Sequence, residues 1–281
     1  MTSPRPYPAP RALLDKYRLR AKKSWGQNFL GDQAVLDAIA RLAVEREGEV
    51  VVELGAGLGH LTVRLLARGA RVVAVERDRD MARVLRGEVG EVVRLLEADA
   101  ARLDYRALAA EAGEGRVAVV GNLPYHLSSP ILFSLLDQAE AVSRAVVLLQ
   151  LEVAERLAAA PGTRTWGLLS ALLQQRAEVS LERRVPAGAF LPPPRVASAV
   201  VRIAFGPPRV PVEDQAGFRR LVKAGFAQRR KTLANALRAA RLGSPGAVAR
   251  ALEAAGIEPS RRGETLTVAE WAALQRALAA R

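Results

Sequence analysis

The chain has 281 residues, of which 50% are hydrophobic, and this is enough to bury the core of one large domain and a small one. It contains no cysteine, which excludes disulfides, thiolate metal sites and cysteine nucleophiles. Its longest apolar runs, such as AVVLLQL, are far shorter than a membrane span, and its first residues contain no apolar signal core. We therefore expect a cytoplasmic protein that uses neither a membrane nor a metal.

The net charge of +13 is concentrated at the two ends of the chain. Residues 1–26 carry a net charge of +6 and residues 181–281 carry +11, whereas residues 27–180 carry −4. An arginine-rich composition alone would spread the excess evenly. The localised excess favours a polyanionic partner, most simply nucleic acid. A membrane surface is the alternative, but no basic amphipathic segment with large apolar side chains is present.

Predicted strands and helices alternate along the first two thirds of the chain. The first 20 residues are rich in proline and arginine, and we expect their start to be mobile. Apolar residues then recur at helical spacing over residues 32–44. Buried-type strands and further helices follow, at 50–54, 60–67, 71–78, 79–89, 92–100, 116–122, 129–138 and 144–159. This order predicts an α/β fold with a doubly wound, mostly parallel sheet.

The pattern changes near residue 207. The alternating segment 197–203 predicts one more strand, and three prolines between residues 207 and 211 form a stiff linker. Beyond them there are no strand signals, and the sequence predicts three or so amphipathic helices. We therefore expect a first domain over residues 1–207, with a basic N-terminal extension, and a small all-helical domain over residues 208–281.

A glycine-rich loop follows the first predicted strand. Gly55, Gly57 and Gly59 lie between that strand and a helix, where glycines allow a tight turn and a close approach to a ligand. The next strand ends in Glu76, which lies 17 residues beyond Gly59, the region of an acid that binds ribose hydroxyls. The alternative is that Glu76 is a solvated residue after a strand. We take Gly55, Gly57 and Glu76 as candidate cofactor contacts.

The spacing of the loop argues against a dinucleotide. His60 stands where a pyrophosphate-binding loop would carry its third glycine, which disfavours a dehydrogenase. Glu53, just before the loop, suits a positively charged ligand, and S-adenosylmethionine carries a sulfonium and no phosphate. Asp99, at the end of the third strand, can accept a hydrogen bond from an adenine amino group, although an aspartate there is often only a helix cap. We expect S-adenosylmethionine as the cofactor.

The segment GNLPY follows the fourth strand and should border the same crevice, because ligands lie at the carboxyl ends of such strands. The side-chain oxygen of Asn122 can accept a hydrogen bond from an exocyclic amine. Pro124 restricts Leu123 to an extended conformation, which can aim the Leu123 carbonyl at the same amine. Tyr125 offers a flat face on which a base can stack. Two acceptors can hold an adenine N6 near tetrahedral geometry, so that its lone pair points at a methyl sulfonium. The alternative is a tight turn with a buried tyrosine.

The chain resembles the small-subunit ribosomal RNA adenine dimethyltransferases over nearly its whole length. Seven segments carry the resemblance in order: KKSWGQNFL (22–30), VVELGAGLGHLT (51–62), VERDRD (75–80), EADA (97–100), GNLPYHLSSPILF (121–133), FLPPPRVASAVVRI (190–203) and FAQRRKTLANAL (226–237). The resemblance implies a Rossmann-like class I methyltransferase domain with a helical C-terminal domain. It also implies an enzyme that makes N6,N6-dimethyladenosine at two adjacent adenosines, and we expect it to be a monomer. These lie in the 3′-terminal hairpin loop of 16S rRNA, within a pre-assembled small ribosomal subunit.

The resemblance adds two cofactor contacts that the residues themselves do not reveal. It implies that Asn28 and Leu30 border S-adenosylmethionine together with the contacts already named, which include Asn122. Two positions depart from the family pattern. His126 stands where such proteins commonly have asparagine, and we expect it to be a hydrogen-bonding substitute rather than a base. Trp25 stands where a smaller apolar residue is usual.

Two other functions remain open beside this one. A large-subunit rRNA adenine N6-methyltransferase of the macrolide-resistance type would share the cofactor motifs. The cluster of Arg229, Arg230 and Lys231 at the start of a basic helix suits phosphates and favours the small-subunit class, although such a cluster can also be a solvated helix face. A non-catalytic RNA-binding assembly factor would keep the fold, but the intact candidate site argues against it.

Overall fold

The computed structural model describes residues 7–228 and 230–280, so Arg229 lies outside the described residues. The chain forms two compact units. The first comprises the residues up to Ala154 together with Ser180–Phe205, and the second comprises Glu155–Val179 and Gly206–Arg281. The sequence placed residues 155–179 in the first domain. In the structure they group with the C-terminal helices because α8 (Leu168–Arg176) packs on α9 (Gln215–Ala227).

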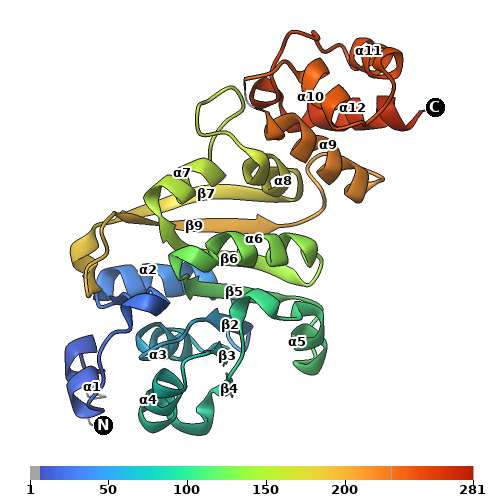
Figure 1. Cartoon of the computed structure of the whole chain (residues 1–281). Coiled ribbons are helices and arrows are strands. Elements are labelled where there is room, and N and C mark those ends of the chain that lie inside the picture. The colour runs from blue at the N-terminus through green and yellow to red at the C-terminus, as the bar shows by residue number, and fades with distance from the viewer. Residues whose placement is uncertain (1–6, 229, 281) are drawn as a thin grey trace. The chain divides into compact units, whose positions relative to one another are not determined.

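The first unit is built around a seven-stranded sheet with the strand order β4-β3-β2-β5-β6-β9-β7 (Figure 1). The strands are β2 Val50–Leu54, β3 Arg71–Val75, β4 Arg94–Leu96, β5 Val117–Asn122, β6 Val142–Gln150, β7 Ala177–Val185 and β9 Ser198–Phe205. Neighbouring strands from β4 to β6 pair in parallel, whereas β9 pairs with β6 in the antiparallel sense. The predicted α/β fold with a mostly parallel sheet is therefore confirmed.

Helices connect the parallel strands in turn: α3 His60–Ala67, α4 Arg79–Val89, α5 Tyr105–Glu111 and α6 Ser128–Asp137. Two helices, α1 Pro10–Lys16 and α2 Gln33–Ala43, precede β2, and α7 Leu151–Leu157 follows β6. Strand β2 lies between β3 and β5, so the chain order reverses on the two sides of β2. A crevice opens at such a reversal, outside the carboxyl ends of the strands, and this places the functional site.

The sheet is buried on both faces. Val51, Val120 and Val146 face one side, where they pack in one core with Ile39 of α2 and Leu65 of α3. Residues of the opposite parity, such as those at 52, 119 and 147, are also fully buried. Burial of both parities explains why these strands read as continuous apolar runs rather than as an alternating pattern.

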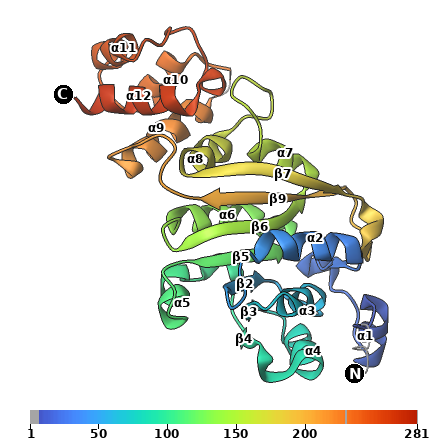
Figure 2. The same cartoon turned by 180° about the vertical axis from the view of Figure 1, so that it is seen from behind.

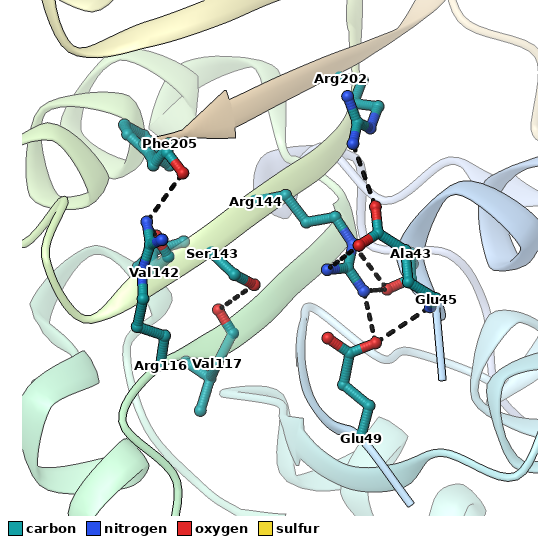
Figure 3. A network of polar contacts seen from close by, with 10 residues as sticks. All are labelled: Ala43, Glu45, Glu49, Arg116, Val117, Val142, Ser143, Arg144, Arg202 and Phe205. Carbon is teal, nitrogen blue, oxygen red and sulfur yellow. Dashed lines mark hydrogen bonds and ion pairs between the residues drawn. The ribbon is translucent and has the colours of Figure 1, made fainter. Parts of the chain in front are cut away.

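A network of charged side chains holds together the amino ends of the parallel strands (Figure 3). Arg144 of β6 is 4% exposed and donates from Nη2 to the carbonyl oxygen of Ala43 at 2.6 Å. It also forms ion pairs with Glu45, at 3.1 Å, and with buried Glu49. Arg202 of β9 donates to Glu45 at 3.0 Å. A buried arginine needs such partners, and this network fixes the loop between α2 and β2 at the end of the sheet opposite to the crevice.

Residues 7–20 are folded onto the first unit rather than extended into solvent. Leu13 and Leu14 of α1 are buried in a cluster with Phe29, Leu58 and Met81. The strand β1 (Phe29–Leu30) continues this segment and pairs with β8 (Phe190–Leu191). The expectation of a mobile start therefore does not extend to residues 7–20. Figure 2 shows this N-terminal segment, in dark blue, from behind.

The second unit is mostly helical in its described residues, and residues 177–179 at the start of β7 also belong to it. Its main helices are α8, α9, α10 Leu233–Ala239, α11 Pro245–Ala254 and α12 Val268–Ala279. The single basic helix expected over 226–237 is divided, because Thr232 caps a new helix by accepting a hydrogen bond from the Asn235 amide at 3.4 Å. Trp271 is fully buried against α9 at Gly225, where a Cβ atom would lie 2.2 Å from the indole. In the part of the chain that the structure describes, no helix is long and apolar enough to cross a membrane.

Candidate functional site

A cavity of about 370 Å³ opens at the carboxyl ends of β2, β3 and β5 in the first unit. All the residues that the sequence analysis assigned to the cofactor or to the target adenine line it: Asn28, Leu30, Gly55, Gly57, Glu76, Asp99, Asn122, Leu123 and Tyr125. The structure thus brings together side chains that are spread over about a hundred residues of sequence. The role of each one remains a prediction.

The glycine loop has the backbone geometry that its composition predicts. Gly55 and Gly57 have φ values of +70° and +56°, in the left-handed region that favours glycine. The Gly55 amide donates to the Val75 carbonyl at 2.8 Å, which holds the start of the loop against β3. The Gly57 amide donates to Glu76 Oε2, also at 2.8 Å. The loop and the candidate ribose ligand are therefore one hydrogen-bonded unit.

Glu76 is 9% exposed, and both of its oxygens accept backbone hydrogen bonds. Oε1 accepts from the Asp78 amide and Oε2 from the Gly57 amide, each at 2.8 Å. Burial raises the pKa of Glu76, and these two hydrogen bonds oppose the shift because they favour the ionised form. A carboxylate oxygen has two lone pairs, so each oxygen retains one that can accept from a hydroxyl group in the cavity.

Glu53 is a second acid on the cavity wall, and it is only 2% exposed. Its Oε2 accepts a hydrogen bond of 2.6 Å from the hydroxyl of Thr62. Burial raises the pKa of Glu53 to about 8, against the opposing effect of the Thr62 hydrogen bond, and the nearby charge of Glu76 adds to the rise. A cationic ligand in the cavity would favour the ionised form of this carboxyl.

Asn122 lies at the end of β5 with its amide group held in one orientation. Its Nδ2 donates to the carbonyl oxygen of Asn28 at 2.8 Å. The Nδ2 atom of Asn28 in turn donates to the carbonyl oxygen of Gly26 at 3.1 Å. Because Nδ2 of Asn122 is engaged with the backbone, its Oδ1 is left as the acceptor for a ligand amine.

The residues after Asn122 continue along the cavity wall. Leu123 is 1% exposed, and its amide donates to the Leu148 carbonyl at 3.2 Å, so β5 and β6 remain joined here. Tyr125 is half-buried, and its hydroxyl shares a hydrogen bond of 3.1 Å with the buried hydroxyl of Ser198. His126 is exposed and faces Gly26, where a Cβ atom would lie 3.6 Å from the imidazole Nδ1. The expected role of His126 as a substitute for asparagine stays a prediction.

Asp99 is a helix cap that also lies on the cavity wall, and its contact with adenine stays a prediction. Its Oδ1 accepts from the Ala101 amide at 3.0 Å and caps a short 3-10 helix, while the residue also lines the cavity. Its Oδ2 lies 3.6 Å from Nη1 of Arg77. The guanidinium of Arg77 lies 5.4 Å from the ring centroid of Trp25, within cation–π distance. The sequence carried no signal for this Trp25–Arg77–Asp99 chain other than the position of Arg77 next to Glu76.

The sequence analysis also missed how residues 22–30 are attached to the site. Asp78, at the start of α4, is 2% exposed and binds two side chains of this segment. Lys22 Nζ lies 2.7 Å from its Oδ1, and Gln27 Nε2 donates to its Oδ2 at 2.7 Å. Lys22 Nζ also lies 2.7 Å from Asp80 Oδ2. These contacts join residues more than fifty positions apart, and no local sequence pattern predicts them.

The polar groups that line the cavity fit a cationic nucleoside better than a phosphate. Among the lining residues, Arg77 is the one lysine or arginine, and it pairs with Asp99. The acidic lining residues are Glu53, Glu76 and Asp99. Acidic side chains and backbone carbonyls accept from hydroxyl and amino groups and attract a positive charge. The residues present therefore fit S-adenosylmethionine.

The predicted RNA contacts lie in the second unit. Arg230 and Lys231 are exposed in the turn between α9 and α10, directly before the capping residue Thr232. They thus precede a helix rather than occupy its first turn. Their proposed contact with phosphates stays a prediction.

Comparison with known proteins identifies the family of the chain. The sequence model of the family described as "Ribosomal RNA adenine dimethylase" matches residues 18–279. The chain is 71% identical over 279 residues to a "Ribosomal RNA small subunit methyltransferase A" of Anaeromyxobacter sp. (strain K), with 97% of this chain and 98% of that protein covered. A protein of the same name from Myxococcus xanthus is 54% identical over 272 residues, with 96% and 95% covered.

Solved structures show the same fold. The crystal structure of 23S rRNA methyltransferase ErmE superposes with a TM-score of 0.70 at 24% identity, over 90% of this chain and 100% of that one. A dimethyladenosine transferase from Plasmodium falciparum superposes with a TM-score of 0.73 at 24% identity, over 88% and 95%. The Rossmann-like methyltransferase fold with C-terminal helices is thereby confirmed. The chain belongs to the ribosomal RNA adenine dimethylase family.

Proposed function

We propose that this enzyme transfers methyl groups from S-adenosylmethionine to N6 of two adjacent adenosines in the 3′-terminal hairpin loop of 16S rRNA, within the assembling small ribosomal subunit. The observation that supports it most directly is the fixed amide of Asn122. Its Nδ2 bonds to the Asn28 carbonyl, so its Oδ1 presents an acceptor at the cavity wall next to Leu123. Close relatives named as small-subunit methyltransferases support the choice of the small subunit.

Different lining residues would contact different parts of the cofactor. Glu76 would accept from the ribose hydroxyls with its free lone pairs, and Asp99 would accept from the adenine amino group. Gly55 and Gly57 would allow the close approach of the loop, and Asn28 and Leu30 would also border the cofactor. When bound, S-adenosylmethionine supplies an electrophilic methyl group on a positively charged sulfur. Glu53 would stabilise that charge.

The residues at the end of β5 would hold the target base. The two N–H groups of the adenine amine would donate to Asn122 Oδ1 and to the Leu123 carbonyl oxygen, which draws the nitrogen toward tetrahedral geometry. Tyr125 would stack on the base, with its ring fixed through Ser198. The reacting nitrogen is neutral, so no general base is required before attack. The proton that leaves after each transfer would pass to water.

The second unit would supply contacts to the rRNA backbone. Arg229, Arg230 and Lys231 are the candidates, and a cluster of cations binds phosphates without reading sequence. The enzyme would act in the cytoplasm as a monomer, on a pre-assembled small subunit rather than on free rRNA. It would thus serve as a ribosome biogenesis factor.

The test is methyl transfer from labelled S-adenosylmethionine to three substrates in parallel: small subunits that lack the modification, large subunits, and protein-free 16S rRNA. The proposal predicts label in the small subunits and little in the other two. Label in the large subunits would favour the macrolide-resistance type of activity. Binding of small subunits without any transfer would favour a non-catalytic assembly factor.

A further inference from the structure

The segment that precedes the family match is packed against the cofactor loop. The family model matches residues 18–279, so residues 7–17 lie outside the matched segment. We call these residues the N-terminal clasp. They reach the glycine loop at its tip, Leu58, which lies between Gly57 and Gly59. Both glycines have a positive φ, of +56° and +84°.

The clasp contacts both the backbone and the side chain of Leu58. The hydroxyl of Tyr7 donates to the carbonyl oxygen of Leu58 at 2.7 Å. The Leu58 side chain is 1% exposed and lies in a hydrophobic cluster with Leu13 and Leu14 of the clasp. Glycines on either side leave the local backbone conformation poorly determined by its own sequence. Contacts from the clasp therefore help to fix the conformation of the loop tip, together with Phe29 and Met81 of the same cluster.

His60 completes the attachment on the other side of Gly59. Its Nε2 lies at hydrogen-bond distance, 2.9 Å, from the carbonyl oxygen of Pro8. The Tyr7 ring packs edge-on against the imidazole with ring centroids 5.2 Å apart. A Cβ atom at Gly59 would lie 2.7 Å from the Tyr7 hydroxyl, so the absence of a side chain at this position is what admits Tyr7. Tyr7, Gly59 and His60 are thus fitted to one another.

The attachment at Leu58 lies one residue from Gly57, a proposed cofactor contact. The Gly57 amide, next to Leu58, donates to Glu76 Oε2. A shift of the loop tip would carry the Gly57 amide away from Glu76 and so disturb the carboxylate that faces the ribose hydroxyls. A mispositioned binding group weakens a ligand even when all its contacts are nominally present. The tip is therefore coupled to cofactor affinity rather than to the base-binding end of the cavity.

We propose that Tyr7 and His60 are positioning residues for the cofactor site, which act by fixing the glycine loop. This proposal rests on the proposed S-adenosylmethionine site. It goes beyond the family match for Tyr7, which lies outside the matched residues 18–279, and it assigns a positioning role to His60, which lies inside them. Neither residue needs to touch the reacting atoms for this role.

The first experiment compares two hydroxyl deletions in the clasp. Tyr7→Phe should raise the KM for S-adenosylmethionine and the Kd for S-adenosylhomocysteine about two- to tenfold, the range expected for loss of one hydrogen bond. The kcat and the KM for small subunits should not change. Tyr17→Phe is the matched control, because the Tyr17 hydroxyl lies beside Gly87 and Glu88 of α4 rather than at the Leu58 carbonyl. It should lower the melting temperature without changing either cofactor constant.

Replacement of His60 gives a rescue test. His60→Ala should weaken cofactor binding, and His60→Gln, which keeps a side-chain donor for the Pro8 carbonyl, should recover part of the loss. Equal cofactor constants in the wild type and Tyr7→Phe would overturn the proposal, as would a fall in kcat with the cofactor KM unchanged. Failure of the wild type to bind S-adenosylhomocysteine would overturn the proposed function as well, so the two failures are distinguishable.

A second measurement needs no variant. If the clasp positions the loop for the cofactor, linkage requires the cofactor to stabilise the clasp to the same extent. Saturating S-adenosylhomocysteine should slow amide hydrogen exchange in peptides covering residues 10–17 of the wild-type protein. Exchange in α12 serves as the reference. An unchanged exchange rate in the clasp, with clear protection of the glycine loop, would contradict the coupling.

Discussion

The hydroxyl groups of Tyr125 and Ser198 share a hydrogen bond of 3.1 Å that joins the cavity wall after β5 to the start of β9. Ser198 is fully buried, so this bond satisfies a group that water cannot reach. It also fixes the plane of the tyrosine ring. The proposed role of the ring is stacking, and the hydroxyl would act only through orientation.

The first prediction separates stacking from hydrogen bonding at this position. Tyr125→Phe should reduce kcat only mildly, because the ring stays in place, and should lower stability by about 1 kcal/mol because Ser198 loses its partner. Tyr125→Ala should reduce transfer severely. Single-turnover methylation rates and melting temperatures of both variants check this. Equal losses of activity in the two variants would contradict a stacking role.

The second prediction concerns the acceptor at the reacting amine. Asn122→Ala should reduce the rate of transfer roughly a hundredfold or more, the scale found for removal of a positioned hydrogen bond in catalysis. Because Asn122 also holds the Asn28 carbonyl, the Kd for S-adenosylhomocysteine should be measured beside the rate. Near-normal turnover in this variant would remove Asn122 from the mechanism.

The third prediction uses the buried acid of β2. The pKa of Glu53 is about 8 in the folded protein and 4.5 is its ordinary value, so the folded state favours the protonated form. The contribution of Glu53 to stability is therefore complete below pH 4.5 and is lost as the pH rises toward 8. Glu53→Gln stays neutral at every pH and should lack this dependence.

Melting temperatures of the cofactor-free wild type and of Glu53→Gln, measured from pH 5 to pH 9, test this difference. The stability of the wild type should fall relative to that of the variant as the pH increases. Buried groups that do not interact with Glu53 are common to both proteins and cancel in the comparison. Parallel curves would show that Glu53 keeps the same protonation in the folded and unfolded states.

The fourth prediction concerns the basic cluster of the second unit. Replacing Arg229, Arg230 and Lys231 together by glutamine should weaken binding to small subunits and flatten its dependence on salt. Each lost phosphate contact should reduce the slope of log K against log salt by about 0.7 to 0.9. The Kd for S-adenosylhomocysteine is the control and should not change. A salt slope equal to that of the wild type would mean that the cluster faces solvent.

The elements that the sequence predicted well have strong local patterns. Strand β2 was predicted with its observed bounds, 50–54, because a β-branched run ends at a glycine loop. Strand β7 was missed because it is an edge strand with several exposed charged residues, and its pairing with β9 is set by partners outside its own sequence. The break at Thr232 was missed because a cap inside an otherwise helical pattern is a weak signal.

The residues of the candidate site also divide into those that the sequence could place and those that it could not. The cavity residues that follow strands could be placed from the sequence, because parallel strands end at one edge of a sheet. Asn28 could not, since its contact with Asn122 spans 94 positions and depends on how residues 22–30 fold across the site. The contacts of Tyr7 and His60 could not be predicted either, because their partners are backbone carbonyls.

The number of methyl groups added to each adenosine tests the central claim most directly. An unmodified amine can donate to both acceptors, Asn122 Oδ1 and the Leu123 carbonyl. After one transfer the remaining N–H can still donate to one of them if the pocket accommodates the first methyl group. Mass spectrometry of nucleosides from unmodified small subunits, incubated with excess S-adenosylmethionine, counts the products. The account predicts N6,N6-dimethyladenosine at two adjacent positions, four transfers per subunit. Accumulation of only the monomethyl nucleoside, or of modification in large subunits instead, would contradict it.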